Sequence, residues 1–160
     1  TLNNKPLDEL INFSLFKDEK NILVQIFCGD KKNILEEILA ILTKKLPLAI
    51  CIGSSTDGEI NNAEITTLKT VISISTFEKT TLKTIHIEEK DSFKNGVLLA
   101  QALCCENTKL LLTFTDGGTT NGEEFLNGIA SINSKVLVSG GMAGDNAHFT
   151  QTFISSQNNI

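Results

Sequence analysis

The sequence contains no arginine, because all 14 of its positively charged residues are lysines, and these face 19 acidic residues. The formal net charge is -5 and the sequence pI is about 5.0, which argues against a partner that needs a basic face, such as nucleic acid. Without arginine, no side chain can grip a carboxylate or phosphate in a bidentate manner. An anionic ligand would have to be held by main-chain N–H groups, hydroxyls or lysine.

The sequence also lacks a C-x-x-C pair and any metal-ligand spacing between cysteine and histidine. The residues concerned are Cys28, Cys51, Cys104, Cys105, His86 and His148. A structural zinc site needs about four convergent ligands, and these positions do not predict one. We therefore expect reduced, mostly buried cysteines, no metal and no cofactor.

A signal-type apolar run and a segment of membrane length are absent too, so we expect no membrane partner. The sequence begins at Thr1 rather than methionine, and we expect a piece of a larger cytoplasmic protein. With 160 residues, 41% of them apolar and 21% charged, the chain is long enough for one domain with its own core.

The first part of the chain predicts a β-α-β arrangement. Residues 1–21 form an N-terminal extension or short helix, and Ile22 to Phe27 form an apolar strand. Asp30 is a suitable N-cap for a helix that ends before Pro47, and Leu48 to Gly53 follow as the next strand.

The second part repeats the alternation of helices and strands. Asp91 or Ser92 can cap a helix, and Asn121 can cap another. The strands predicted around them are Leu110 to Thr115, Val136 to Ser139 and His148 to Ile154. Between the two parts, Leu68 to Thr76 and Leu82 to Glu89 alternate between apolar and polar residues, which favours a half-exposed antiparallel pair.

We therefore predict an α/β fold with a mixed, largely parallel central sheet, flanking helices and an antiparallel strand pair. Residues 22–154 form the single domain. Residues 155–160 are expected to be a tail, or a cut linker to a missing C-terminal region.

Three predicted strands end in small, polar, glycine-bearing loops: SSTDGEI after Gly53, DGGTTNG after Thr115, and SGGMAGD after Val138. In open α/β sheets, ligands lie outside the carboxyl ends of the strands, so we expect the three loops to form one rim. The candidate ligand-binding residues are Ser54, Ser55, Thr56, Glu59, Asp116, Gly117, Gly140, Gly141, Gly144 and Asp145.

An amino-acid zwitterion would suit this rim, because hydroxyls and N–H groups can bind its carboxylate while Glu59, Asp116 or Asp145 accepts from its ammonium group. The structural alternative is that the hydroxyls cap nearby main-chain groups, the aspartates form turns, and the glycines meet conformational needs. Both readings remain open from the sequence.

Two other classes of function compete with a binding domain. A hydrolase would use Ser54 or Cys28 as nucleophile with His148 as base, but no nucleophile elbow surrounds either residue, so we expect no catalysis. An interaction module would use the alternating strands between Leu68 and Glu88 as an edge, either for a homodimer or for docking the missing region.

The three loops resemble motifs of the FIST family, specifically its N-terminal domain. The matches are IGSSTDGEI from Ile52 to Ile60, the strand end from Phe114 to Gly117 with Asn121, Gly122, Glu123 and Glu124 after it, and SGGMAGD with Phe149 and Thr152 downstream. Their order and spacing agree over roughly residues 22–154. The sequence departs from the family pattern at Ser54, where cysteine is frequent, and at Asp57, where alanine or glycine is usual.

This resemblance implies a sensory, ligand-binding domain of bacterial-type signalling proteins that binds small molecules such as amino acids. It also implies a fused or cognate output partner, for example a histidine kinase, a diguanylate cyclase or a chemotaxis receptor.

Overall fold

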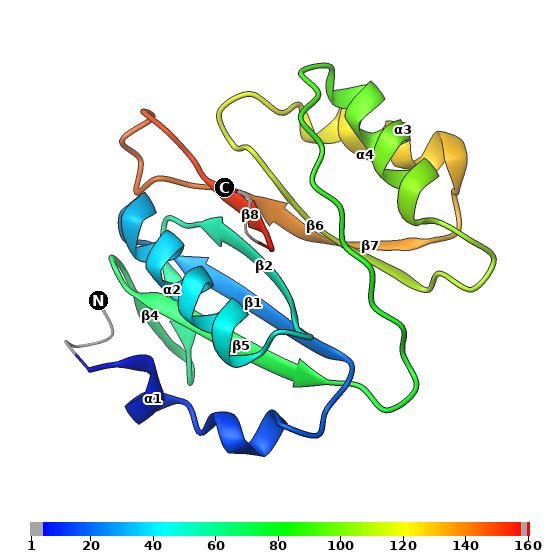
Figure 1. Cartoon of the computed structure of the whole chain (residues 1–160). Coiled ribbons are helices and arrows are strands. Elements are labelled where there is room, and N and C mark those ends of the chain that lie inside the picture. The colour runs from blue at the N-terminus through cyan, green and yellow to red at the C-terminus, as the bar shows by residue number, and fades with distance from the viewer. Residues whose placement is uncertain (1–4, 158–159) are drawn as a thin grey trace.

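The structure is a computed structural model that describes residues 5–157 and residue 160. It contains two α/β units, each made of a sheet that is covered by helices on one face (Figure 1). The helix α2 covers the first sheet, and the helices α3 and α4 cover the second. The prediction of an α/β fold with flanking helices is confirmed.

The first unit is a four-stranded sheet with the order β5-β1-β2-β8. Strands β1 (Ile22–Cys28) and β2 (Ile50–Ser55) are parallel and are connected by α2 (Lys32–Lys45). Strand β5 (Thr70–Thr76) is antiparallel to β1, and β8 (Ile154–Ser156) is antiparallel to β2. This sheet is mixed as predicted, but only its central pairing is parallel.

The core of the first unit lies between α2 and β1. The helix turns an apolar stripe that includes Leu35 and Leu42 toward Val24 and Ile26, and all four side chains are buried. Each such side chain contributes about 1.5–3 kcal/mol of burial free energy. The predicted cap at Asp30 is displaced by one residue, because the N-cap is Lys31 and Asp30 accepts a hydrogen bond from the Lys31 N–H.

The second unit is a parallel pair, β6 (Leu110–Thr115) and β7 (Leu137–Met142), connected by α4 (Gly122–Ile132). Helix α3 (Ser92–Leu103) packs beside α4. A second core, smaller than the first, contains Ala100, Leu111, Phe125 and Ile129.

The helix caps of the second unit are confirmed. The Asp91 carboxylate accepts from the Lys94 N–H at 2.8 Å, and the Asn121 side chain accepts from the Glu124 N–H at 3.2 Å. Such side-chain acceptors satisfy N–H groups that have no partner inside the helix.

Three short elements complete the fold. Helix α1 (Leu7–Leu10) and a 3-10 helix (Phe13–Phe16) lie in the expected N-terminal helical region. Strands β3 (Glu59–Asn61) and β4 (Glu64–Thr66) form an antiparallel hairpin after β2. None of the helices in the described part of the chain has the length and apolar character that crossing a bilayer requires.

The predicted antiparallel pair between residues 68–76 and 82–89 is wrong. Strand β5 pairs with β1, and residues 82–89 run extended without being assigned to a strand. Alternation of apolar and polar residues identifies an extended chain with one buried side, but it does not identify the partner of that chain.

Two further boundaries differ from the prediction. Strand β7 continues through Gly140 and Gly141, which we had placed in a loop. Strand β8 begins at Ile154, the last residue of the predicted strand, so buried Ser155 and Ser156 belong to the sheet rather than to the tail that we expected.

Candidate functional site

The structure brings the three predicted loops together at one edge, which we call the strand-end rim. The Gly144 N–H donates to the Ser55 carbonyl at 3.0 Å, and the Ala143 N–H donates to the Thr115 carbonyl at 2.8 Å. Residues 143 and 144 therefore join the end of β2, in the first sheet, to the end of β6, in the second.

Close contacts between the loops explain two of the rim glycines. A side chain at Gly117 would collide with the Ala143 carbonyl oxygen, and one at Gly144 would collide with the Asp57 carboxylate. At both positions only a glycine lets the loops approach one another this closely.

Asp57 holds the third loop in place. Its carboxylate accepts from the Asn146 N–H at 2.6 Å, while the Asn146 side chain donates to the Gly29 carbonyl at 3.0 Å. The loop after β7 is thereby fixed against the ends of β1 and β2.

The carboxylate of Asp116 accepts hydrogen bonds from the Gly118 N–H at 2.7 Å, the Thr119 hydroxyl at 2.9 Å and the Thr152 hydroxyl at 2.7 Å. Burial alone would raise the pKa of Asp116, but these hydrogen bonds outweigh burial and hold the pKa below its usual value. Asp116 therefore stays ionised and connects the β6 loop to the segment before β8.

Asp145 is used in a turn. Its carboxylate accepts from the main-chain N–H groups of Thr150 at 2.6 Å, Phe149 at 2.9 Å and Gln151 at 3.2 Å. The Thr150 N–H makes the largest contribution to lowering the pKa of Asp145, which falls to about 2.

Glu59 lies inside the protein with a relative exposure of 1%. Its carboxylate accepts from the Thr56 hydroxyl at 2.6 Å and from the Lys69 N–H at 3.1 Å, and the main chain at Gly29 packs against it. Glu59 does not line either of the two cavities described below.

The smaller cavity, of about 310 Å³, opens at the rim, and we call it the strand-end cavity. Four of its lining residues are predicted site residues: Ser54, Thr56, Gly140 and Gly141. The other lining residues are Gln25, Phe27, Leu112, Phe114, Ser139 and Met142.

The walls of the strand-end cavity combine aromatic and hydroxyl groups. Phe27 and Phe114 meet edge to face with ring centroids 5.7 Å apart. The Ser54 hydroxyl donates to the Ser55 carbonyl at 2.8 Å and the Thr56 hydroxyl donates to Glu59, so both oxygens keep their lone pairs for another donor. Gly141 has no atom within 4 Å of the place where a side chain would begin.

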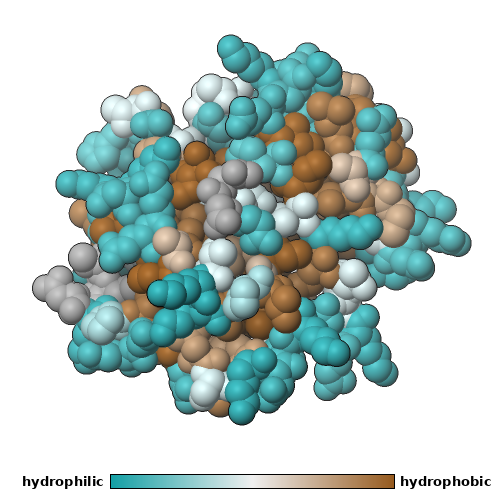
Figure 2. Space-filling model, in the orientation of Figure 1, coloured by the Kyte–Doolittle hydropathy of each residue, from teal (hydrophilic) through white to brown (hydrophobic). Residues whose placement is uncertain are grey.

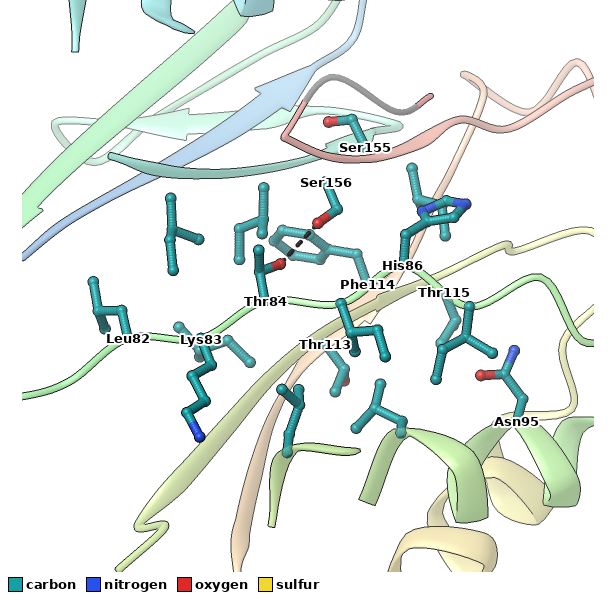
Figure 3. Close-up of a pocket in the computed structure, with 18 of the residues that line it drawn as sticks. Leu82, Lys83, Thr84, His86, Asn95, Thr113, Phe114, Thr115, Ser155 and Ser156 are labelled. Atoms are coloured by element: carbon teal, nitrogen blue, oxygen red, sulfur yellow. Dashed lines mark hydrogen bonds between the residues drawn. The ribbon is translucent and has the colours of Figure 1, made fainter. Parts of the chain in front are cut away.

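A larger cavity, of about 1330 Å³, lies between the two sheets, and we call it the inter-sheet cavity (Figure 3). Asp116 is the one predicted site residue that lines it. Residues 79–90, between β5 and α3, form much of its wall. Figure 2 shows apolar side chains exposed near the middle of this face, with hydrophilic side chains around the periphery.

The remaining predicted residues line neither cavity. Ser55 links β2 to the segment before β8, because its hydroxyl accepts from the Phe153 N–H at 2.9 Å, and Gly117, Gly144 and Asp145 make the loop contacts described above. The sequence signal within residues 79–90 was the alternation of residues 82–89, which we had assigned to a paired strand.

The hydrolase arrangement is not assembled. Cys28 and Ser54 are buried, whereas His148 is exposed, and no hydrogen bond between His148 and either residue is found in the described part of the chain. Residues 5–157 and 160 also contain no group of three or more histidine, cysteine or acidic side chains able to hold a metal ion.

Comparison with known proteins identifies the family. No curated protein and no solved structure matches the chain. A family model described as the FIST N domain matches residues 22–160, nearly the whole chain. The chain therefore belongs to the FIST N family, a membership consistent with a sensor domain of a signal-transduction protein.

Proposed function

We propose that this domain is a non-catalytic sensor that binds a small polar metabolite, such as an amino acid, in the strand-end cavity. The observation that carries the proposal is the position of Ser54, Thr56, Gly140 and Gly141 around one hollow of about 310 Å³. That volume is at the lower end of the range of about 300–1000 Å³ that is usual for small-ligand pockets.

The hydrogen-bonding pattern favours a ligand that carries donors. The Thr56 hydroxyl already donates to the buried Glu59 carboxylate, so its oxygen can accept from a ligand ammonium group. The negative charge of Glu59 would strengthen that second hydrogen bond. The proposed partnership between Glu59 and an ammonium group is thus indirect, through Thr56.

The carboxylate of an amino acid would need donors in the same cavity. No lysine is among the lining residues, so the Gln25 amide, the Ser139 hydroxyl and the main chain at Gly140 and Gly141 are the groups proposed to bind it. A ligand with few charges fits this lining better than one with several, because unpaired buried charges are costly.

The position of the cavity supports a sensing role. A ligand there would touch Thr56 beyond the end of β2 and Gly141 in β7, which belong to different sheets. Binding could then bias the packing of the two units, which a fused or cognate output domain would read. A cytoplasmic location is part of the same proposal and is supported by the four free thiols.

Thermal-shift measurements with the twenty amino acids and common metabolites test the proposal. A ligand at a hundredfold excess over its Kd should stabilise the protein by about 2.7 kcal/mol. The Gly141→Leu variant, which fills the cavity, should lose the shift, whereas Gly118→Leu, outside both cavities, should keep it. The proposal fails if no compound stabilises the wild type, or if the shift survives in Gly141→Leu.

A second candidate is a dimer interface on the first unit. Strand β5 is an outer strand, and the neighbouring segment exposes Ile60 at 72%, Ile65 at 79% and Leu68 at 60%. Sedimentation velocity over a range of concentrations should show a dimer that Ile65→Lys abolishes. Leu15→Lys, at a residue that is 70% exposed on the 3-10 helix, is the matched control.

A further inference from the structure

The inter-sheet cavity is larger than the range of about 300–1000 Å³ that small-molecule pockets usually occupy. It is also long. Lys109, before β6, and Asp116, after β6, both line it, so it follows the whole length of that strand. Seven residue steps at about 3.3 Å each correspond to roughly 23 Å.

One end of this cavity is cationic. Lys83 lines the cavity together with Cys105, Asn107 and Thr108 of the segment that follows α3. Lys109 is four residues after Cys105 and immediately before β6, and both lysines line the cavity and are exposed.

The other end is anionic. Asp116, which accepts from the Thr152 hydroxyl, and Glu88, 3.7 Å from the His86 ring, line it, and neither forms an ion pair with a lysine in the part of the chain that the structure describes. Glu89 also lies at this end but is paired with Lys94 at 2.6 Å. Lys90 lines the same end, and Lys32, which also lines the cavity, is paired with Glu36, so Asp116 and Glu88 exceed the unpaired lysines there.

Contacts at the start of α3 show that the two walls run in the same direction. The Glu89 carbonyl accepts from the Asn95 side chain, and the Ser92 hydroxyl accepts from the Asn121 N–H, which follows the β6 loop. The ends of residues 83–88 and of β6 therefore meet at α3, with acidic groups on both walls.

Unpaired main chain lines the space between these ends. Across residues 79–88, no main-chain group hydrogen-bonds to another main-chain group within the described part of the chain. Strand β6 is bonded to β7 on one edge and to no other described strand. The segment is held beside β8 through the Thr84 and Ser156 hydroxyls, 2.7 Å apart, as Figure 3 shows.

We propose that the inter-sheet cavity binds an extended peptide of about six residues, which spans roughly 20 Å. The peptide lies antiparallel to β6, with its free ammonium group toward Asp116 and Glu88 and its free carboxylate toward Lys83 and Lys109. Its main chain pairs with the unpaired groups of the cavity walls, as in β-strand addition. Apolar side chains of the peptide contact residues such as Ile52, Leu112 and Phe114.

This proposal goes beyond the sensing of a small metabolite, because the ligand is of another class and its charged ends are held by residues outside the strand-end cavity. The two cavities share a wall at Leu112 and Phe114.

A pool of random hexapeptides with free termini, incubated with the protein and recovered by size exclusion, provides the test, with mass spectrometry as the readout. The same pool with acetylated and amidated termini is the chemical control. We expect the free pool to be retained and the capped pool to be lost, because both end charges are then absent.

Charge reversal distinguishes the cavity from the rest of the surface. The double variant Lys83→Glu and Lys109→Glu should retain about tenfold less peptide, since each reversed lysine turns attraction of the carboxylate into repulsion. The double variant Lys17→Glu and Lys20→Glu makes the same change of net charge on exposed lysines that do not line the cavity, and should retain peptide as the wild type does.

Hydrogen exchange of the main-chain amides adds a second measurement. Its result would not change if the peptide were held only by the attraction between its charged ends and the protein. Amides in residues 79–88 should exchange quickly in the free protein and at least tenfold more slowly with the retained peptides, as expected for main-chain pairing. Gly141→Leu should leave peptide retention intact even if it abolishes a shift by amino acids, which separates this proposal from the proposed function.

Three results would overturn the peptide proposal. One is that wild-type protein retains no hexapeptide. Another is that capped and free pools are retained equally. The third is that the amides of residues 79–88 are already protected without peptide, which would mean that the segment pairs with β6 by itself.

Discussion

The strand-end rim and residues 79–90 use polar groups in opposite ways. At the rim, the Asp57 carboxylate accepts a hydrogen bond from the loop after β7, and the Asp145 carboxylate accepts from three N–H groups within that loop. Along residues 79–88, the described main chain forms no hydrogen bond with other main chain. The rim is therefore largely a structural junction between loops. In the segment between β5 and α3, by contrast, the main-chain donors and acceptors of residues 79–88 have no main-chain partner in the described part of the chain.

The comparison shows that polar residue type alone does not identify a ligand contact. Asp145 and Thr56 are equally plausible in the sequence, yet the Asp145 carboxylate accepts from three N–H groups whereas Thr56 lines a cavity. A binding role depends on which groups remain unsatisfied after the fold has formed.

The largest effect on the free energy of unfolding is expected at Gly140, where β7 passes close to β6. Its φ is +146°, and a side chain there would collide with the Thr113 carbonyl oxygen in β6. Gly140→Ala should lower the free energy of unfolding by roughly 3 kcal/mol, through backbone strain and the clash. Urea denaturation followed by circular dichroism measures this difference.

The neighbouring glycine is the matched control for that measurement. Gly141→Ala should change the free energy of unfolding by less than about 0.5 kcal/mol, because the added carbon would enter open space. Equal destabilisation by the two variants would contradict the explanation that the backbone conformation of Gly140 and its close contact with β6 require a glycine there.

Glu59 gives the next largest expected effect. Glu59→Gln keeps the shape of the side chain but replaces one acceptor oxygen with an NH2 group, so either the Lys69 N–H or the Thr56 hydroxyl loses its acceptor. A buried donor left without a partner should cost about 2 kcal/mol in unfolding free energy, measured by thermal or urea denaturation. The exposed Glu106 supplies the control, since Glu106→Gln should have almost no effect.

Much of the fold could be predicted because short-range sequence signals, such as apolar runs and helix-capping residues, determine where many of its elements begin and end. Strand β6 has the predicted boundaries, and the caps at Asp91 and Asn121 are those that the sequence indicated. Strand β7 could not be delimited, because glycines that usually signal a turn are required here by the close approach of β6. The pairing of β5 could not be predicted either, since alternation carries no information about the partner strand.

The candidate site was only partly predictable for a related reason. Sequence order at the strand ends correctly indicated that the three loops would lie near one another. It could not show that the Phe149, Thr150 and Gln151 N–H groups would take up the Asp145 carboxylate, because that depends on the path of the loop after β7. The inter-sheet cavity was missed because its long wall had been placed in a sheet.

A smaller effect is expected in residues 79–90, at Thr84. Thr84→Val removes the hydroxyl that contacts Ser156 and should lower the free energy of unfolding by about 1 kcal/mol. The change in the rate of main-chain amide exchange should be confined to residues near β8 and to residues 79–90. Thr81→Val alters an exposed threonine of the same segment and should leave exchange unchanged. Global destabilisation by Thr84→Val would show that residues 79–90 are as integral to the fold as the rim.

The smallest effect expected is a pH dependence from Asp145, whose pKa falls from 3.8 to about 2 in the folded protein. Because the folded value is the lower one, the ionised carboxylate stabilises the fold above about pH 4, and this contribution is lost as the pH falls toward 2. Asp145→Asn should therefore flatten the acid limb of the stability curve, measured by urea denaturation between pH 2 and pH 5, while Asp18→Asn at an exposed position should not. An unchanged acid limb would show that the turn around Asp145 is stable without the charge of the Asp145 carboxylate. The hydrogen bonds of this carboxylate would then contribute less to the stability of the rim than their number indicates.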